Sequence, residues 1–133
     1  MDIEILVSSI LRAHGFAVTT EALEIEVTTS VVTIDFHPRD TLLYAELDLE
    51  RGLAYNHNFH INPRLRHRGI GARLLAALEE ICSQADLTIL INNNRNPAFW
   101  KRNGYRRINP FWQVLLSKQL GIPFTENSMY KRL

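Results

Sequence analysis

The chain has 133 residues, of which 46% are hydrophobic, and a formal net charge of +1 at pH 7. This length and apolar content predict one compact domain over residues 1–133 with a single core. The balanced charge argues against a dedicated nucleic-acid-binding protein, which is normally far more basic.

Cys82 is the only cysteine, so no intrachain disulfide can form and a reducing cytoplasm is the expected location. It falls on the apolar face of a predicted helix, which indicates a core residue rather than a nucleophile. No apolar run reaches the roughly 18 residues that a membrane span needs. Asp2 and Glu4 stand where a signal peptide carries positive charge, so no such peptide is expected.

The first predicted element is an amphipathic helix over residues 3–14, because apolar side chains recur there at helical spacing. Asp2 can cap its start and Gly15 can end it. Residues 23–27 alternate between apolar and polar, and both a strand and a helix fit them. Three strands with short turns follow and predict an antiparallel meander. These strands are Val31–Phe36, Thr41–Leu49 and Leu53–Ile61.

The pattern then changes to alternating helices and strands. A helix begins near Ala72, and the apolar run Leu87–Ile91 is typical of a buried parallel strand. A right-handed crossover places that run beside Leu53–Ile61. Asn96 and Pro97 begin a short helix that Gly104 ends. The remaining predicted elements are a strand starting in Tyr105–Ile108, a helix over Phe111–Leu120 and a last strand at Ser128–Leu133.

The segment Asn62–Ala72 carries the most specific signal in the chain. It joins a strand to a helix and places Arg66, Gly69 and Gly71 in the pattern Arg-x-x-Gly-x-Gly. Glycines let a ligand approach the backbone, and the unpaired N–H groups of a helix start favour an anion. The segment lacks the ending of a P-loop and the third glycine of a dinucleotide loop. It predicts a phosphate socket of another kind, the alternative being a glycine-rich turn before an ordinary helix.

The Arg66–Ala72 pattern resembles the acetyl-CoA loop of the GCN5-related N-acetyltransferase (GNAT) family. Asn93–Tyr105 resembles the family's Asn…Ala…Phe-Tyr-x-Lys-x-Gly-Phe segment, and Met129–Leu133 looks like its closing strand. The resemblance implies an α/β (α+β) acyl-CoA N-acyltransferase fold, with a mixed, mostly antiparallel sheet and a central parallel βαβ crossover flanked by helices. The N-terminal part is short for this family, since one helix stands where two are usual.

The resemblance implies acetyl-CoA as co-substrate and no metal. The main chain near His60 and Ile61 would pair with the pantetheine arm, Asn93 would contact that arm, and Trp100 would line its thiol end. The Ile61 N–H would also face the thioester carbonyl and stabilise an oxyanion. N–H groups of the loop would hold the diphosphate, with added charge from Arg66 and Arg68. The loop residues are Arg66, His67, Arg68, Gly69, Ile70, Gly71 and Ala72.

Proton transfer is the part of the chemistry that the sequence leaves open. Glu46 and His60 are the candidate bases, because both are expected near the open ends of the central strands. His57 and His60 point to opposite faces of a regular strand, which argues against a metal pair unless a bulge changes their parity. Trp100 stands where the family often has a tyrosine that protonates the leaving thiolate. An indole N–H cannot do this, and Tyr105 and Tyr130 are substitutes by residue type only.

The predicted function is an acetyl-CoA-dependent N-acetyltransferase that acts on a primary amine of a small molecule or protein. The alternative is a catalytically weak or inactive acyl-CoA-binding sensor or scaffold of the same fold, which Trp100 and the short N-terminal part favour. No nucleic-acid or membrane partner is predicted. The apolar segment Phe111–Leu120 would cover the acceptor pocket, pack in the core or form a homodimer surface.

Overall fold

The computed structural model describes residues 2–133 of the chain. This part contains seven strands and five helical segments. The strands are β1 (Leu23–Val27), β2 (Val31–Phe36), β3 (Thr41–Asp48), β4 (Leu53–Ile61), β5 (Ile89–Asn93), β6 (Arg106–Arg107) and β7 (Ser128–Arg132). The helices are α1 (Ile3–Ala13), the 3₁₀ turn η1 (Pro63–Leu65), α2 (Ile70–Gln84), α3 (Pro97–Arg102) and α4 (Pro110–Leu120).

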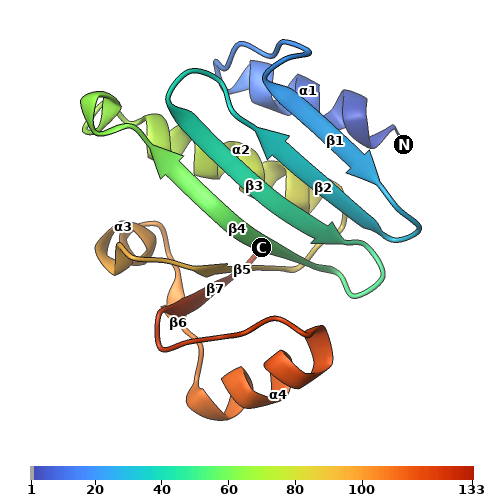
Figure 1. Cartoon of the computed structure of the whole chain (residues 1–133), viewed down its shortest axis with the longest axis vertical. Coiled ribbons are helices and arrows are strands. Elements are labelled where there is room, and N and C mark those ends of the chain that lie inside the picture. Colours follow the sequence, from blue (N-terminus) through green and yellow to red (C-terminus); the bar gives the residue numbers. More distant parts are fainter. Residues whose placement is uncertain (1) are drawn as a thin grey trace.

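The strands form one mixed sheet in the order β1-β2-β3-β4-β5-β7-β6 (Figure 1). Neighbouring strands are antiparallel except β4 and β5, which run parallel and are connected through α2. The predicted meander and the predicted βαβ crossover are both confirmed. Residues 23–27, which fitted either a strand or a helix, form the edge strand β1, because they pair along β2.

Helices α1 and α2 cover one face of the sheet (Figure 1) and bury the main core against it. Asp2 caps α1, where its carboxylate accepts hydrogen bonds from the N–H groups of Glu4 and Ile5. The side chains of β2 and β3 alternate between buried and less buried, as expected when one face is covered. Cys82 is buried in α2, and burial together with the charge of Glu79 raises its pKa to about 12. This confirms Cys82 as a core residue.

A smaller cluster lies on the opposite face, around Tyr55, Ile91 and Ile108. Leu116 of α4 and Phe124 of the following segment pack against it. The rest of α4 is more exposed than core packing requires, and none of its residues is buried. Phe111, Trp112 and Val114 are all exposed. Core packing is therefore wrong for these three side chains, and the homodimer surface stays a prediction.

Several element boundaries differ from those expected by one or two residues. The helix predicted to begin near Ala72 starts at Ile70, and the parallel strand starts at Ile89, two residues later than the apolar run. Leu87 is nevertheless buried, since it closes the end of α2 against the core. Among residues 2–133, no helix combines the length and the apolar character that crossing a membrane demands.

Candidate functional site

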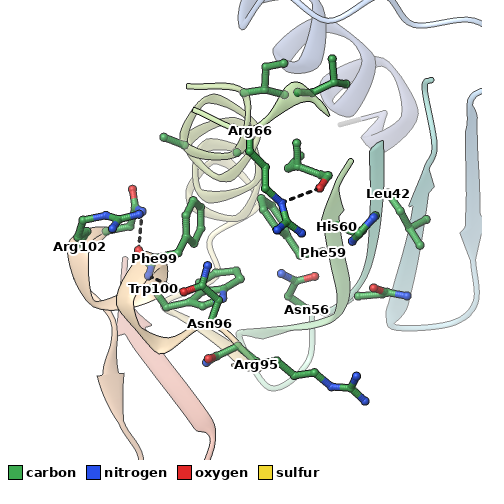
Figure 2. A pocket seen from close by; sticks show the side chains of 18 of the residues that line it. Leu42, Asn56, Phe59, His60, Arg66, Arg95, Asn96, Phe99, Trp100 and Arg102 are labelled. Atoms are coloured by element: carbon green, nitrogen blue, oxygen red, sulfur yellow. Dashed lines mark hydrogen bonds between the residues drawn. The ribbon is translucent and has the colours of Figure 1, made fainter. Parts of the chain in front are cut away.

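A cleft of about 1050 Å³ lies where β4 and β5 separate. The two strands pair only from Leu53 to Asn56 on β4 and from Ile89 to Asn92 on β5. Beyond Asn56 they diverge, and the start of α2 and helix α3 line the gap (Figure 2). The cleft therefore has a strand edge on one side and a helix N-terminus at its end.

A β-bulge lies at the fork of the two strands. Tyr44 pairs with Asn58, whereas Ala45 pairs with Asn56, so His57 is an extra residue on β4. A bulge of this kind bends the strand and re-aims its side chains. The parity of β4 changes here, which places His57 and His60 on the same face of the sheet. Within residues 2–133, no three side chains of the types that bind metals come together.

The main chain of β4 turns alternate residues toward the cleft. The Asn62 N–H donates to the Asp40 carbonyl at 2.8 Å, so it faces β3. Because hydrogen-bonding directions alternate along an antiparallel strand, the main chain of His60 also faces β3, while those of Phe59 and Ile61 face the cleft. The Arg66 Nε donates to the Ile61 carbonyl at 3.3 Å from that side. The predicted position of Ile61 fits this geometry, and Phe59 is a second residue of the same kind that the sequence did not reveal.

The loop after β4 presents a row of N–H groups. No described residue accepts a hydrogen bond from the N–H groups of residues 67–72, and Arg73 is the first to bond within the helix, to the Gly69 carbonyl at 3.0 Å. His67 and Gly69 both have positive φ, 65° and 74°, which folds the loop back onto the start of α2. Unpaired N–H groups and the helix dipole together make a socket for an anion.

Gly71 is needed for packing as well as for the loop. A Cβ atom at this position would lie 3.1 Å from Phe99 Cε1 on α3 and 3.6 Å from Ile61 Cγ1 on β4. The start of α2 thus approaches both walls of the cleft closely. Even a methyl group here would require Phe99 to shift by a few tenths of an ångström.

Basic side chains surround the cleft. Arg66, His67, Arg95 and Arg102 line it, and Figure 2 shows Arg66, Arg95 and Arg102 on different sides of the gap. Arg64 is paired with Asp40 at 3.0 Å. Arg68, which was expected to add charge to the socket, lies outside the lining. The other loop residues predicted to hold the diphosphate, Gly69, Ile70, Gly71 and Ala72, all line the cleft.

An aromatic cluster joins α3 to β4. Trp100 is 4% exposed. The centroid of its ring lies 5.3 Å from that of Phe59, 5.3 Å from that of Phe99 and 5.0 Å from that of Tyr105. Asn96 caps α3 by accepting a hydrogen bond from the Phe99 N–H at 3.4 Å. This packing gives this part of the cleft a fixed shape.

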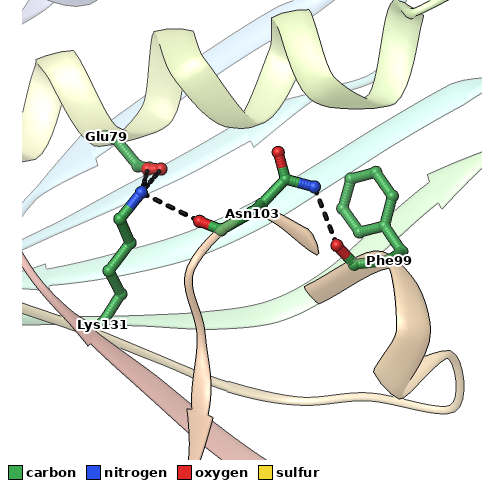
Figure 3. A network of polar contacts seen from close by, with 4 residues as sticks. All are labelled: Glu79, Phe99, Asn103 and Lys131. Atoms are coloured by element: carbon green, nitrogen blue, oxygen red, sulfur yellow. Dashed lines mark hydrogen bonds and ion pairs between the residues drawn. The ribbon is translucent and has the colours of Figure 1, made fainter. Parts of the chain in front are cut away.

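Polar contacts connect the end of α3 to helix α2 and strand β7 (Figure 3). The Lys131 ammonium on β7 donates to Glu79 of α2 at 2.9 Å and to the Asn103 carbonyl at 2.9 Å. The Asn103 amide donates to the Phe99 carbonyl at 2.8 Å. One lysine therefore joins α2, the residue that ends α3, and β7.

A family model described as "Acetyltransferase (GNAT) domain" matches residues 23–107, which is more than half of the chain. The chain belongs to the GNAT acetyltransferase family. The match spans both sequence motifs, the forked strands and the anion socket.

Solved structures of GNAT proteins share the fold at low sequence identity. Tetrahymena GCN5 aligns with a TM-score of 0.62 and 12% identity over 79% of this chain and 69% of that one. A GNAT-family acetyltransferase from Staphylococcus aureus gives 0.62 and 12% over 98% and 92%. The PaiA N-acetyltransferase of Thermoplasma acidophilum, solved with coenzyme A, gives 0.54 and 16% over 78% and 62%. No curated protein sequence matches significantly.

Within this GNAT fold, the Asn93 side chain has partners other than a ligand. Its amide nitrogen donates to the Tyr55 hydroxyl at 2.5 Å and to the Pro123 carbonyl at 3.1 Å, and its oxygen accepts from the Ser128 hydroxyl. Asn93 still lines the cleft. With the side chain occupied, the main chain of Asn93 is the part that remains for the predicted contact with pantetheine.

The candidate bases lie in different places. His60 is exposed and lines the cleft, whereas Glu46 does not line it and instead lies 3.2 Å from His57. His57 lines the cleft, and the sequence did not single it out as a base. The bulge that brings it there depends on pairing with β3, which no local pattern announces.

None of the tyrosines proposed by residue type reaches the cleft. Tyr105 lies behind Trp100, 3% exposed, with no hydrogen-bond partner for its hydroxyl among residues 2–133, and burial raises its pKa strongly. Tyr130 packs against the smaller cluster. Tyr55 donates no proton easily either, because burial and the charge of Glu46 raise its pKa against the opposing effect of Asn93.

Proposed function

We propose that this protein is an acetyl-CoA-dependent N-acetyltransferase that transfers the acetyl group directly from the thioester to a primary amine. Membership of the GNAT family supports acyl-CoA-dependent acetyl transfer in general. The observation that carries the proposal is the continuity of the cleft. An anion socket at one end leads to a strand edge with free main-chain groups and then to the fork of β4 and β5.

The parts of the cleft suit successive parts of the co-substrate. The N–H groups of residues 67–72 and Arg66 would hold the diphosphate. The main chains of Phe59 and Ile61 would pair with the pantetheine arm as an added strand, and one of their N–H groups would stabilise the oxyanion of the transition state. The thioester would then lie at the fork, near His57 and Trp100. The amine would attack it without an acyl-enzyme, so alignment and proton transfer are the enzyme's contributions.

A binding protein without catalysis is the second candidate, favoured by Trp100 in place of the usual tyrosine and by the absence of another tyrosine lining the cleft in residues 2–133. Isothermal titration calorimetry with acetyl-CoA, followed by thiol release with a panel of primary amines, separates the two. The enzyme releases thiol with at least one amine. Tight binding without turnover over a broad panel and pH range would instead establish the sensor or scaffold.

A further inference from the structure

His57 occupies an unusual position at the fork of the sheet. As the extra residue of the bulge, it lies where β4 leaves β5, and it lines the cleft. It is on the face of the sheet away from α1 and α2, since the neighbouring core-facing residue, Ala54, is buried on the other side. An acceptor that approaches the thioester from this face would meet His57 first.

Three side chains hold the imidazole of His57. Glu46 Oε1 lies 3.2 Å from its Nε2. The Tyr55 ring packs edge-on at 4.5 Å between centroids, and the Tyr44 ring lies at 5.5 Å. The Nδ1 atom has no hydrogen-bond partner within residues 2–133. The two groups make a close charge contact rather than a hydrogen bond. The negative charge beside Nε2 favours the neutral tautomer with its hydrogen on Nε2, which leaves Nδ1 as a proton acceptor.

Two other histidines in the described residues also lie beside a carboxylate and are hydrogen-bonded to it, His14 to Glu80 at 3.3 Å and His37 to Asp35 at 3.2 Å. Neither of these histidines lines the cleft. His60 does line it but has no carboxylate beside it among residues 2–133. The combination of imidazole, orienting carboxylate and cleft therefore occurs once in the described chain.

We propose that His57 is the general base of the acetyl transfer and that Glu46 is a positioning residue that fixes its tautomer. The inference rests on the proposed function. The acceptor enters as an ammonium ion and gives one proton to Nδ1. The free amine attacks the thioester carbon, the C–N bond forms and the C–S bond breaks. The amide nitrogen loses its second proton to the leaving thiolate through water, and the imidazolium returns its proton to solvent.

Kinetics with the best amine of the panel test the proposal. His57→Gln should lower kcat about 100-fold or more near neutral pH, with affinity for acetyl-CoA within about threefold of wild type by calorimetry. The deficit should shrink as the pH approaches the pKa of the amine, because the acceptor then needs no base. His37→Gln, which removes the same kind of pair outside the cleft, should leave kcat unchanged. A His57→Gln enzyme with wild-type kcat overturns the proposal and leaves the proposed function intact.

Glu46→Gln tests the positioning role and also serves if His57→Gln does not fold. The titratable groups that face His57 are Glu46 and Tyr44 on β3 and Tyr55 on β4. Removing the carboxylate takes away the charge that favours hydrogen on Nε2, so kcat should fall about tenfold while the affinity for acetyl-CoA stays the same. Long-range ¹⁵N–¹H correlation spectra of Glu46→Gln should show hydrogen on Nδ1 in part of the neutral His57 imidazole. A merely structural role for Glu46 would leave the tautomer unchanged, and an unchanged tautomer contradicts the proposal.

The tautomer can be measured without any acceptor. Long-range ¹⁵N–¹H correlation spectra of the imidazoles, with His57 assigned from the His57→Gln variant, should show hydrogen on Nε2. Hydrogen on Nδ1 in the neutral ring would overturn the proposal. If wild type binds acetyl-CoA but acetylates no amine, the proposed function fails and the catalytic role of His57 fails with it.

Discussion

Ala72→Glu provides a sharp test of the anion socket, because it should weaken the ligand and strengthen the helix. Ala72 is exposed, lines the cleft and lies in the first turn of α2. A carboxylate near a helix N-terminus interacts favourably with the dipole, which is worth about 0.3–1 kcal/mol. The free energy of unfolding should therefore stay the same or rise.

The same carboxylate should repel the diphosphate of acetyl-CoA. Taking the diphosphate as two charges at roughly 6 Å, the repulsion is about 1.4 kcal/mol with the dielectric constant of water and about 5.5 kcal/mol at an effective dielectric constant near 20. The lower figure alone is a tenfold loss of affinity. Added salt should reduce the loss, since the charges are near the surface.

Ala76→Glu is the matched control. Ala76 is exposed one turn later on the same helix and does not line the cleft, so the substitution is chemically identical but distant from the socket. Calorimetry with acetyl-CoA and thermal unfolding of both variants complete the test. If both folded variants bind acetyl-CoA with equal affinity, the diphosphate does not bind to the N–H groups of residues 67–72.

Three further outcomes follow from the packing around the cleft. Trp100→Ala should lower the free energy of unfolding in urea by about 3–5 kcal/mol, because it empties the centre of an aromatic cluster. Lys131→Met should lower the free energy of unfolding by about 1–3 kcal/mol, because Glu79 then has no partner. It should also weaken acetyl-CoA binding, because the contact that holds the end of α3 is lost. Lys118→Met on the exposed face of α4 should have neither effect. Stability should fall as the pH rises from 9 toward 12, because the Cys82 thiol ionises only in the unfolded chain. The slope from this group is up to about 1.4 kcal/mol per pH unit, and Cys82→Ala should lack it in urea titrations.

The sequence predicted the elements whose signals are local. Asp2, Asn96 and Gly104 act at helix ends, where one side chain or one positive φ decides the outcome. The anion-binding loop Asn62–Ala72 could be predicted in the same way, because its glycines and the helix after it are contiguous in the sequence. Residues 23–27 could not be decided locally, since their strand conformation comes from pairing with β2.

The orientation of side chains at the fork could not be predicted for a different reason. An insertion of one residue in a ladder reverses the faces of everything that follows it. The insertion at His57 is specified by how β4 registers on β3, not by the sequence of β4 itself. This is why Phe59 and His57 were missed while Ile61, beyond the bulge, was placed through the family motif.

The replacement of a tyrosine by Trp100 weighs less against catalysis than it first suggests. A thiol has a pKa of about 8.5, so a thiolate is already a tolerable leaving group near neutral pH. An alkylammonium of pKa about 10.4 is deprotonated in fewer than one molecule in 10³ at pH 7. A general base that deprotonates the amine can therefore raise the rate by about three powers of ten. A general acid that protonates the thiolate can raise it by less than two powers of ten. If His57 is the base, as we propose, the cleft has the group that matters more for the rate even though Trp100 stands in the place of a phenol.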